Sequence, residues 1–354
     1  MKKFKLIVLI LLLTGCSKKE EINPLKELGY NEEEIHVIET LREENITNLK
    51  NRNYNANYVL LIENEHFNEN YLEDYITLMN QEALSIEDII YIVNNHYNDL
   101  NITYDDTTLL FMKSKYYIHD NLEQYLEYEK NLNQPFSTEQ DKINYTITAV
   151  NSKVNHNFYT NEIPSDLSKG YLMIVNKYHY LSSNYVPNNL VTIDSKYGKV
   201  LELEKTTYEA FIEMYNAASE DGVNLYIFSP YRSYSTQYSL YNRYVNRDGK
   251  TLADTYSARA GYSEHQTGLA IDISRRGGNL NGFESTNEFK WLKNNSYKYG
   301  FIIRYPKDKE WITGYQYEPW HYRYVGIDAA TQIYEENITF EEYYAYYVDK
   351  NRTF

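Results

Sequence analysis

The chain has 354 residues, 42% of them hydrophobic and 24% charged, and its formal net charge is −15. This length and hydrophobic content indicate globular folding, with room for two domains, rather than disorder. The negative charge argues against nucleic acid as a partner, because phosphate binding requires a basic face. It also disfavours attraction to anionic lipid headgroups.

The N-terminus has the pattern of a secretory signal. Lys2, Lys3 and Lys5 precede an apolar run over residues 6–13, which is too short to span a bilayer as a permanent helix. The next residues, Leu13-Thr14-Gly15-Cys16, resemble a bacterial lipobox. We therefore expect residues 1–15 to be a cleaved lipoprotein signal peptide and Cys16 to carry diacylglycerol. The predicted location is the extracytoplasmic face of the cell membrane, lipid-anchored, in a Gram-positive host.

Cysteine usage limits the chemistry of the mature protein. Cys16 is the only cysteine, so the fold has no intramolecular disulfide and no other thiolate to bind a metal. Residues 16–23 comprise the lipidated cysteine and a short polar linker rich in Lys and Glu, which suits a flexible tether.

Residues 24–165 repeat themselves loosely, which predicts a degenerate repeat domain of α-rich or mixed structure. Asn31 with Glu34, and Ser85 with Asp88, resemble the capping pairs at helix starts. Apolar residues follow each pair at helical spacing. The repeat domain has no charged or metal-ligand cluster, and its expected role is to space the rest of the protein from the membrane or to dock on cell-wall material.

The elements predicted for residues 166–354 are of mixed type and indicate an α+β domain. Three helices are expected. The first is capped by Thr206 and turns Phe211, Ile212 and Tyr215 inward, and the other two cover about residues 235–247 and 287–295. Strands are expected over 225–228, 269–273 and 300–305.

Two short stretches of this domain hold the residues of a metal site. His265, Asp272 and His321 match the three protein ligands that a catalytic zinc takes when thiolates are absent. Gly268 allows a turn between the first two, so both side chains can reach one face. Glu318, three residues before His321, is the candidate general base, because zinc lowers the pKa of bound water and a carboxylate can then take the proton.

The pattern Ser-x-His-x-x-Gly-x-Ala-x-Asp over 263–272, followed by Glu-x-Trp-His over 318–321, resembles the VanY-type D-alanyl-D-alanine carboxypeptidases, a zinc peptidase family that includes LD-carboxypeptidases. Further matches, such as Tyr231-Arg232-Ser233, extend the resemblance over about residues 166–354. The resemblance implies the same zinc ligands and the same base. It also implies helices packed on one face of a small antiparallel sheet, with the metal on the other.

The resemblance further implies a role for Arg232, which follows a predicted strand. Its guanidinium could grip the carboxylate of a peptide C-terminus or the developing oxyanion, and both roles stay open. Ser263, Gln237 and Arg304 are weaker candidates for substrate contacts, and a structural hydrogen bond is equally expected for each.

The predicted function is zinc-dependent removal of the C-terminal D-alanine from peptidoglycan stem peptides. Within the same family, the alternatives are LD-carboxypeptidase or peptidoglycan endopeptidase activity. A different class is a non-catalytic, zinc-dependent lipoprotein that binds the wall, which the presence of Glu318 disfavours because a pure binder needs no base. The sequence indicates no protein partner.

Overall fold

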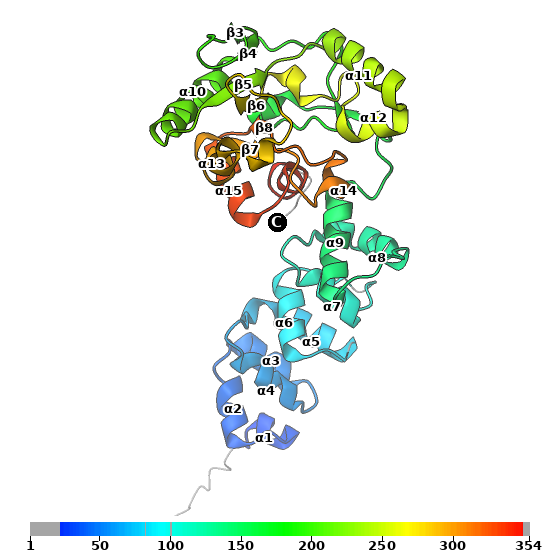
Figure 1. Ribbon diagram of the computed structural model, residues 1–354. Coiled ribbons are helices and arrows are strands. Elements are labelled where there is room, and N and C mark those ends of the chain that lie inside the picture. Colours follow the sequence, from blue (N-terminus) through cyan, green and yellow to red (C-terminus); the bar gives the residue numbers. More distant parts are fainter. Residues whose placement is uncertain (1–21, 82, 100, 350–354) are drawn as a thin grey trace, which may run out of the picture. The chain divides into compact units, whose positions relative to one another are not determined.

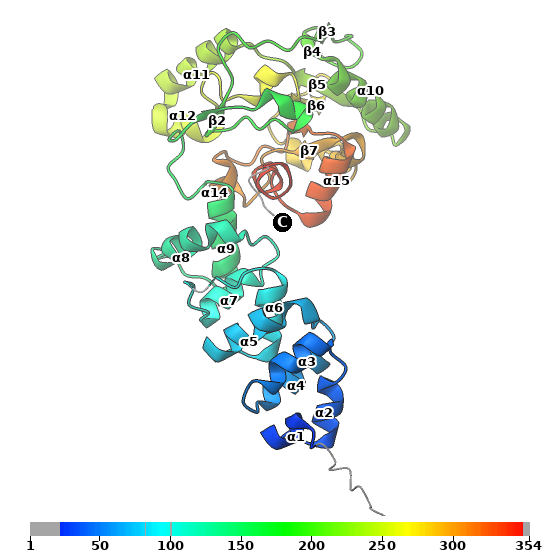
Figure 2. The same cartoon turned by 180° about the vertical axis from the view of Figure 1, so that it is seen from behind.

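The computed structural model describes residues 22–81, 83–99 and 101–349, in two compact units that divide between Leu109 and Leu110 (Figures 1 and 2). The predicted signal peptide, Cys16 and most of the linker lie outside the described residues. No helix in the described ranges is both long and apolar enough to cross a membrane.

The N-terminal unit is built from short helices, and no strand occurs among its described residues. Asn31 and Glu34 form the predicted capping box, and Ser85 accepts a hydrogen bond from the backbone of Asp88. Apolar side chains such as Leu25, Ile38 and Leu61 are buried between the helices. The helices are α1 (Pro24–Leu28), α2 (Glu32–Ile38), α3 (Glu43–Lys50), α4 (Ala56–Glu63), η1 (Glu69–Tyr71), α5 (Leu72–Gln81) and α6 (Ile86–Asn94).

The same local arrangement occurs in both units. In the first, the Tyr75 hydroxyl donates to Asn94, whose side-chain amide donates to a backbone carbonyl. In the second, the Tyr125 hydroxyl donates to Asn151, whose amide again donates to a backbone carbonyl. The second pair lies on α8 (Leu122–Lys130) and α9 (Glu139–Asn151), after α7 (Asp106–Met112) and η2 (His119–Asn121). This recurrence agrees with the predicted repeat, whose extent stays a prediction.

Residues 110–151 pack with the C-terminal part of the chain. Tyr116 stacks on Tyr346 with ring centroids 4.0 Å apart, and Tyr145 stacks on Trp311 at 4.3 Å. The compact units therefore divide at a different place from the predicted domain boundary between residues 165 and 166, because these aromatic contacts join the second repeat to the C-terminal elements.

A four-stranded antiparallel sheet in the order β5-β6-β8-β7 is the centre of the second unit. Its strands are β5 (Leu225–Ser229), β6 (Ala270–Arg275), β7 (Phe301–Ile303) and β8 (His321–Tyr324). Side chains from α10 (Lys205–Glu220) and α13 (Asn287–Asn295) form the main core with Ile271 and Tyr322. The predicted α+β class and small antiparallel sheet are confirmed.

The remaining elements complete the second unit. Two further pairs of short strands are β1 (Ile163–Pro164) with β2 (His179–Tyr180), and β3 (Leu190–Thr192) with β4 (Glu202–Glu204). The other helical segments are η3 (Leu167–Leu172), α11 (Tyr234–Asp248), α12 (Lys250–Tyr256), η4 (Glu264–Thr267), η5 (Phe283–Ser285), η6 (Ser296–Tyr299), α14 (Glu310–Thr313), α15 (Ile327–Glu336), α16 (Phe340–Tyr343) and η7 (Tyr344–Val348).

One predicted helix start was wrong. Helix α10 is capped by Glu204, whose carboxylate accepts from the backbone N–H of Thr207, and Thr206 lies inside the first turn. A carboxylate suits this position because the helix N-terminus presents free N–H groups and a partial positive charge. The inward face is consequently Thr207, Phe211, Met214 and Ala218, whereas Ile212 and Tyr215 are only partly buried.

Candidate metal centre

The pairing of two central strands brings Asp272 and His321 together. Asp272 lies on β6 and is the direct Cα partner of His321, the first residue of β8. Neighbours on these strands, Ile271, Ile273 and Tyr322, point into the main core. Because side chains alternate along a strand, Asp272 and His321 project together from the opposite face of the sheet.

The third predicted ligand reaches the same face from the turn before β6. His265 lies on η4, which ends at Gly268 with φ of +69°. A Cβ on Gly268 would stand 3.0 Å from the Cβ of Glu204, so both the left-handed backbone and the close packing require glycine here. This turn reverses the chain directly into β6 and places His265 beside Asp272.

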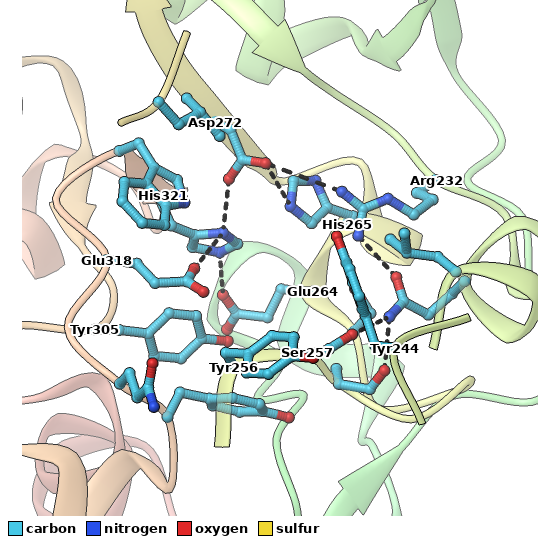
Figure 3. A pocket seen from close by; sticks show the side chains of 18 of the residues that line it. Arg232, Tyr244, Tyr256, Ser257, Glu264, His265, Asp272, Tyr305, Glu318 and His321 are labelled. Carbon is cyan, nitrogen blue, oxygen red and sulfur yellow. Dashed lines mark hydrogen bonds and ion pairs between the residues drawn. The ribbon is translucent and has the colours of Figure 1, made fainter. Parts of the chain in front are cut away.

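The three side chains form a compact set of donors (Figure 3). His265 Nε2 lies 3.5 Å from Asp272 Oδ2, and His321 Nδ1 lies 3.1 Å from Asp272 Oδ1. One ligand atom from each residue lies within 4.8 Å of the others, and all three residues are buried. Two imidazoles and one carboxylate with a side open to a cavity match the ligand set of a catalytic zinc site.

The electrostatics of the site favour a cation. Burial alone would raise the pKa of Asp272, but the adjacent His265 and His321 hold it well below its usual range. Burial lowers the pKa of His321, yet the neighbouring carboxylates of Asp272 and Glu264 outweigh it and raise that pKa to about 9. The carboxylates therefore attract positive charge to this point, and a metal ion can supply it in place of a proton.

Glu318 stands beside the donor set, as predicted. Its Oε2 lies 3.7 Å from His321 Nδ1, and its side chain is 15% exposed. Burial, with a contribution from the charge of Asp272, raises the pKa of Glu318 to about 8. A bound cation would lower this value, so the carboxylate is suited to accept and return a proton near neutral pH.

Arg232 lies on the opposite side of the donor set. Its Nη2 is 3.9 Å from Asp272 Oδ2 and donates to Ser229 Oγ at 2.8 Å. Its Nη1 donates to Gln237 Oε1 at 2.7 Å, and the Gln237 amide donates in turn to the Ala258 carbonyl. These bonds hold the guanidinium at a fixed angle. Gln237 therefore orients Arg232 with its amide oxygen, while its NH₂ group is itself held by the Ala258 carbonyl.

The donor set, Glu318 and Arg232 line one cavity of about 340 Å³. Its walls are rich in aromatic side chains, which include Trp320 and three tyrosines, Tyr244, Tyr256 and Tyr305, labelled in Figure 3. A cavity of this size accepts the end of a peptide rather than a long polymer segment. The predicted catalytic and metal-binding residues therefore face a single pocket.

Comparison with known proteins agrees with this geometry. The sequence profile of the VanY family, described as D-alanyl-D-alanine carboxypeptidase, matches residues 200–327. The bifunctional D-Ala-D-Ala dipeptidase and D-Ala-D-Ala carboxypeptidase VanXYC of Enterococcus gallinarum is 31% identical over 189 residues, which cover 52% of this chain and 98% of that protein. The chain belongs to the VanY family.

Two further relatives define how much of the chain this VanY likeness covers. The YodJ protein of Bacillus subtilis is 45% identical over 184 residues, or 49% of this chain and 66% of YodJ. The chain thus spans slightly less than two thirds of that relative. The solved LdcB LD-carboxypeptidase is 42% identical, covers 53% of this chain and 91% of its own, and superposes with a TM-score of 0.50.

Of the three weaker candidates for substrate contacts, two line the cavity and one does not. Ser263 lines the cavity together with Gln237. Arg304 does not line it, because its guanidinium is fully buried behind the site between Glu264 and Glu341, at 2.7 and 2.6 Å. For Arg304, the geometry therefore favours the structural hydrogen bond over the substrate contact.

Sequence reasoning missed the buried ionic cluster behind the VanY site. Glu264, Arg323 and Glu341 are almost completely inaccessible to solvent and are joined to one another through Arg304 or directly. Each occurs in a stretch that the family resemblance covers. The sequence did hold one signal for this cluster, because these charged residues stand beside apolar positions. A charged side chain that is buried with such neighbours needs a partner of opposite charge.

Proposed function

We propose that this chain is a zinc-dependent carboxypeptidase that removes the C-terminal D-alanine from peptidoglycan stem peptides. The observation that carries the proposal is the convergence of His265, Asp272 and His321 with Glu318 and Arg232 on one cavity. Nitrogen and oxygen donors in this number fit zinc with one position free. Family membership supplies the substrate class, because VanXYC is named for action on D-Ala-D-Ala.

Zinc held by these ligands would supply Lewis acidity, which polarises a carbonyl and acidifies water. The chain's own groups then divide the remaining work. Glu318 Oε2 takes the proton of the attacking water and delivers it to the leaving amine of D-alanine. Arg232, oriented by Ser229 and Gln237, binds either the terminal carboxylate of the peptide or the oxyanion. Its position beside Asp272 supports both roles, so a substrate analogue must decide between them.

The mechanism uses no serine nucleophile. A β-lactam acylates penicillin-binding carboxypeptidases through such a serine. We therefore expect labelled penicillin to leave no covalent adduct on this protein, and a stoichiometric adduct would contradict the proposed chemistry.

A second candidate is LD-carboxypeptidase activity on tetrapeptides, which the 42% identity to LdcB favours. The two activities differ in the configuration of the residue before the bond that is cut. The cavity lining does not select between them, because the ligand set and base are the same for either bond.

The deciding experiment incubates the zinc-loaded protein with a muramyl pentapeptide ending in D-Ala-D-Ala and with the matching tetrapeptide. Mass spectrometry follows the release of D-alanine. Release from the pentapeptide alone identifies a DD-carboxypeptidase, and release from the tetrapeptide identifies an LD-enzyme. Cleavage that persists after a chelator has removed all bound metal would contradict the zinc role. If neither peptide is cut while one zinc binds, the endopeptidase or wall-binding alternative replaces the proposal.

We also propose that the protein acts at the outer face of the membrane through a lipid on Cys16. The support is the lipobox-like sequence, since a diacylglycerol anchor provides the two chains that lasting attachment requires. Cells fed a labelled fatty acid should label the native protein but not the Cys16→Ala variant. Equal labelling of both would refute the anchor.

A further inference from the structure

A buried carboxylate, Glu264, lies directly behind one of the metal ligands. It belongs to η4, immediately before His265, and its side chain is 0% exposed although Glu264 is among the residues that line the cavity. Figure 3 shows it facing the ring of His321, on the side of that ring away from Asp272. Glu264 therefore contacts the site through His321 rather than through the predicted ligand next to it in sequence.

The two oxygens of Glu264 are used differently. Oε1 accepts from Arg304 Nε at 2.7 Å and from Arg323 Nη1 at 2.9 Å. Oε2 has no hydrogen-bond partner, and neither has His321 Nε2, although both atoms are buried. These two atoms lie 3.5 Å from each other. One is an acceptor and the other can carry a proton, so a small closure satisfies both groups at once.

The two histidines present opposite ring nitrogens to the metal position. His265 Nδ1 lies 2.8 Å from the Pro230 carbonyl, which can only accept, so the proton belongs on Nδ1 and the lone pair on Nε2. That Nε2 faces Asp272. In His321 it is Nδ1 that faces Asp272 and Glu318, while Nε2 faces Glu264. His321 can give its Nδ1 lone pair to a metal only if its proton is on Nε2.

The surrounding charges keep Glu264 an acceptor. Arg304 and Arg323 supply two positive charges, and Glu341 supplies a second negative charge by binding Arg304 through two hydrogen bonds of 2.8 and 2.6 Å. The four side chains are buried and balance in formal charge. Such pairing allows a carboxylate to stay ionised in the protein interior, whereas burial of an isolated, unpaired carboxylate would disfavour the ionised form. The cluster also ties the site to α16, which carries Glu341.

We propose that Glu264 is a positioning residue for the metal: it accepts the Nε2–H of His321 and thereby directs the Nδ1 lone pair of that ring to the ion. This inference rests on the zinc role proposed above. A carboxylate that holds the far nitrogen of a metal-binding histidine fixes the tautomer and ring orientation, and its loss typically weakens metal binding by roughly 10- to 100-fold. The Pro230 carbonyl performs the same task for His265.

Glu264→Gln tests the proposal because the side chain keeps its size, while the acceptor oxygen that faces His321 is replaced by a hydrogen-bond donor. The amide oxygen can still accept from the two arginines, which places the NH₂ group against His321 Nε2. That NH₂ can only donate, so Nε2 must become the acceptor and the proton moves to Nδ1, where it blocks the metal. We expect the zinc Kd of the full chain, measured by competition with a chelator, to rise by roughly 10- to 100-fold. The absorption bands of the cobalt-substituted protein should shift.

Glu341→Gln is the matched control. It removes a buried carboxylate from the same cluster without touching His321, so its zinc Kd should stay within about threefold of the native value once folding is confirmed by thermal melting. Equal weakening in both variants would mean that Glu264 acts only through the stability of the cluster. A folded Glu264→Gln variant with native zinc affinity would also overturn the positioning role.

The native protein provides a test that needs no variant. In the zinc-loaded, nitrogen-15-labelled full chain, long-range proton–nitrogen spectra should show His265 bound through Nε2 and His321 bound through Nδ1 with a proton on Nε2. His321 bound through Nε2 would overturn the proposal even if the Gln variant does not fold. These measurements do not depend on turnover. A native chain that binds no zinc defeats the proposed function and this inference together, whereas zinc binding with the wrong tautomer defeats this inference alone.

Discussion

Replacing Glu318 by glutamine should separate catalysis from metal binding. The side chain keeps its shape, and its backbone bonds to Tyr305 and His321 are unaffected. The amide cannot accept the proton of water. General base catalysis contributes roughly 10²- to 10⁴-fold, so we expect kcat to fall by that factor, which corresponds to about 3–5 kcal/mol in the activation free energy.

The same substitution should leave the folded protein intact. Burial raises the pKa of Glu318 to about 8, so the buried carboxylate is disfavoured when ionised, and an uncharged amide removes that penalty. The side chain stands beside the three-ligand set without belonging to it. Zinc content and melting temperature should therefore match or exceed those of the native protein.

The assay follows D-alanine release from the pentapeptide under saturating substrate, with zinc content measured on the same samples. Glu310→Gln serves as the control, because Glu310 is an exposed carboxylate on α14 and does not line the cavity. The reasoning is refuted if the Glu318 variant retains kcat within a factor of about ten while binding one zinc, since a base in contact with the reaction contributes more than that.

Three further predictions concern folding. Burial, with a contribution from the charge of Lys153, lowers the pKa of His179 to about 4 from 6.5, so between these pH values the unfolded chain binds a proton that the folded chain does not. This contribution to the free energy of unfolding is thus present above pH 6.5 and falls by about 1–2 kcal/mol between pH 7 and pH 5. Urea unfolding of His179→Gln should lack this part of the loss. An identical pH dependence in both proteins would contradict the assignment. Arg304→Met leaves Glu264 and Glu341 buried without their shared partner, so the free energy of unfolding should fall by about 3–5 kcal/mol, and a loss below about 1 kcal/mol would mean that the cluster adapts. Gly268→Ala places a side chain on a backbone with φ of +69° and against Glu204. It should lower the free energy of unfolding by at least about 1–2 kcal/mol and weaken zinc binding by displacing His265. Native zinc affinity in this variant would show that the turn adapts.

The sequence by itself selected the candidate metal ligands and the candidate base. His265 and Asp272 are separated by a glycine turn, and Glu318 lies three residues from His321, so short-range spacing and donor chemistry were enough to select them. Capping residues such as Asn31 and Ser85 were equally readable, because a cap depends only on residues within one turn.

Only the tertiary structure decided which side chains meet across long separations. The pairing of β6 with β8 sets Asp272 opposite His321, and the strand β8 itself was not predicted, because its register depends on neighbouring strands. For Arg304 the sequence left a substrate contact and a structural hydrogen bond equally open, because it does not tell an exposed guanidinium from a buried one. Its burial against Glu264 and Glu341 follows from packing, and so does the choice of nitrogen that His321 presents, since a hydrogen-bond partner on the far side of the ring determines it.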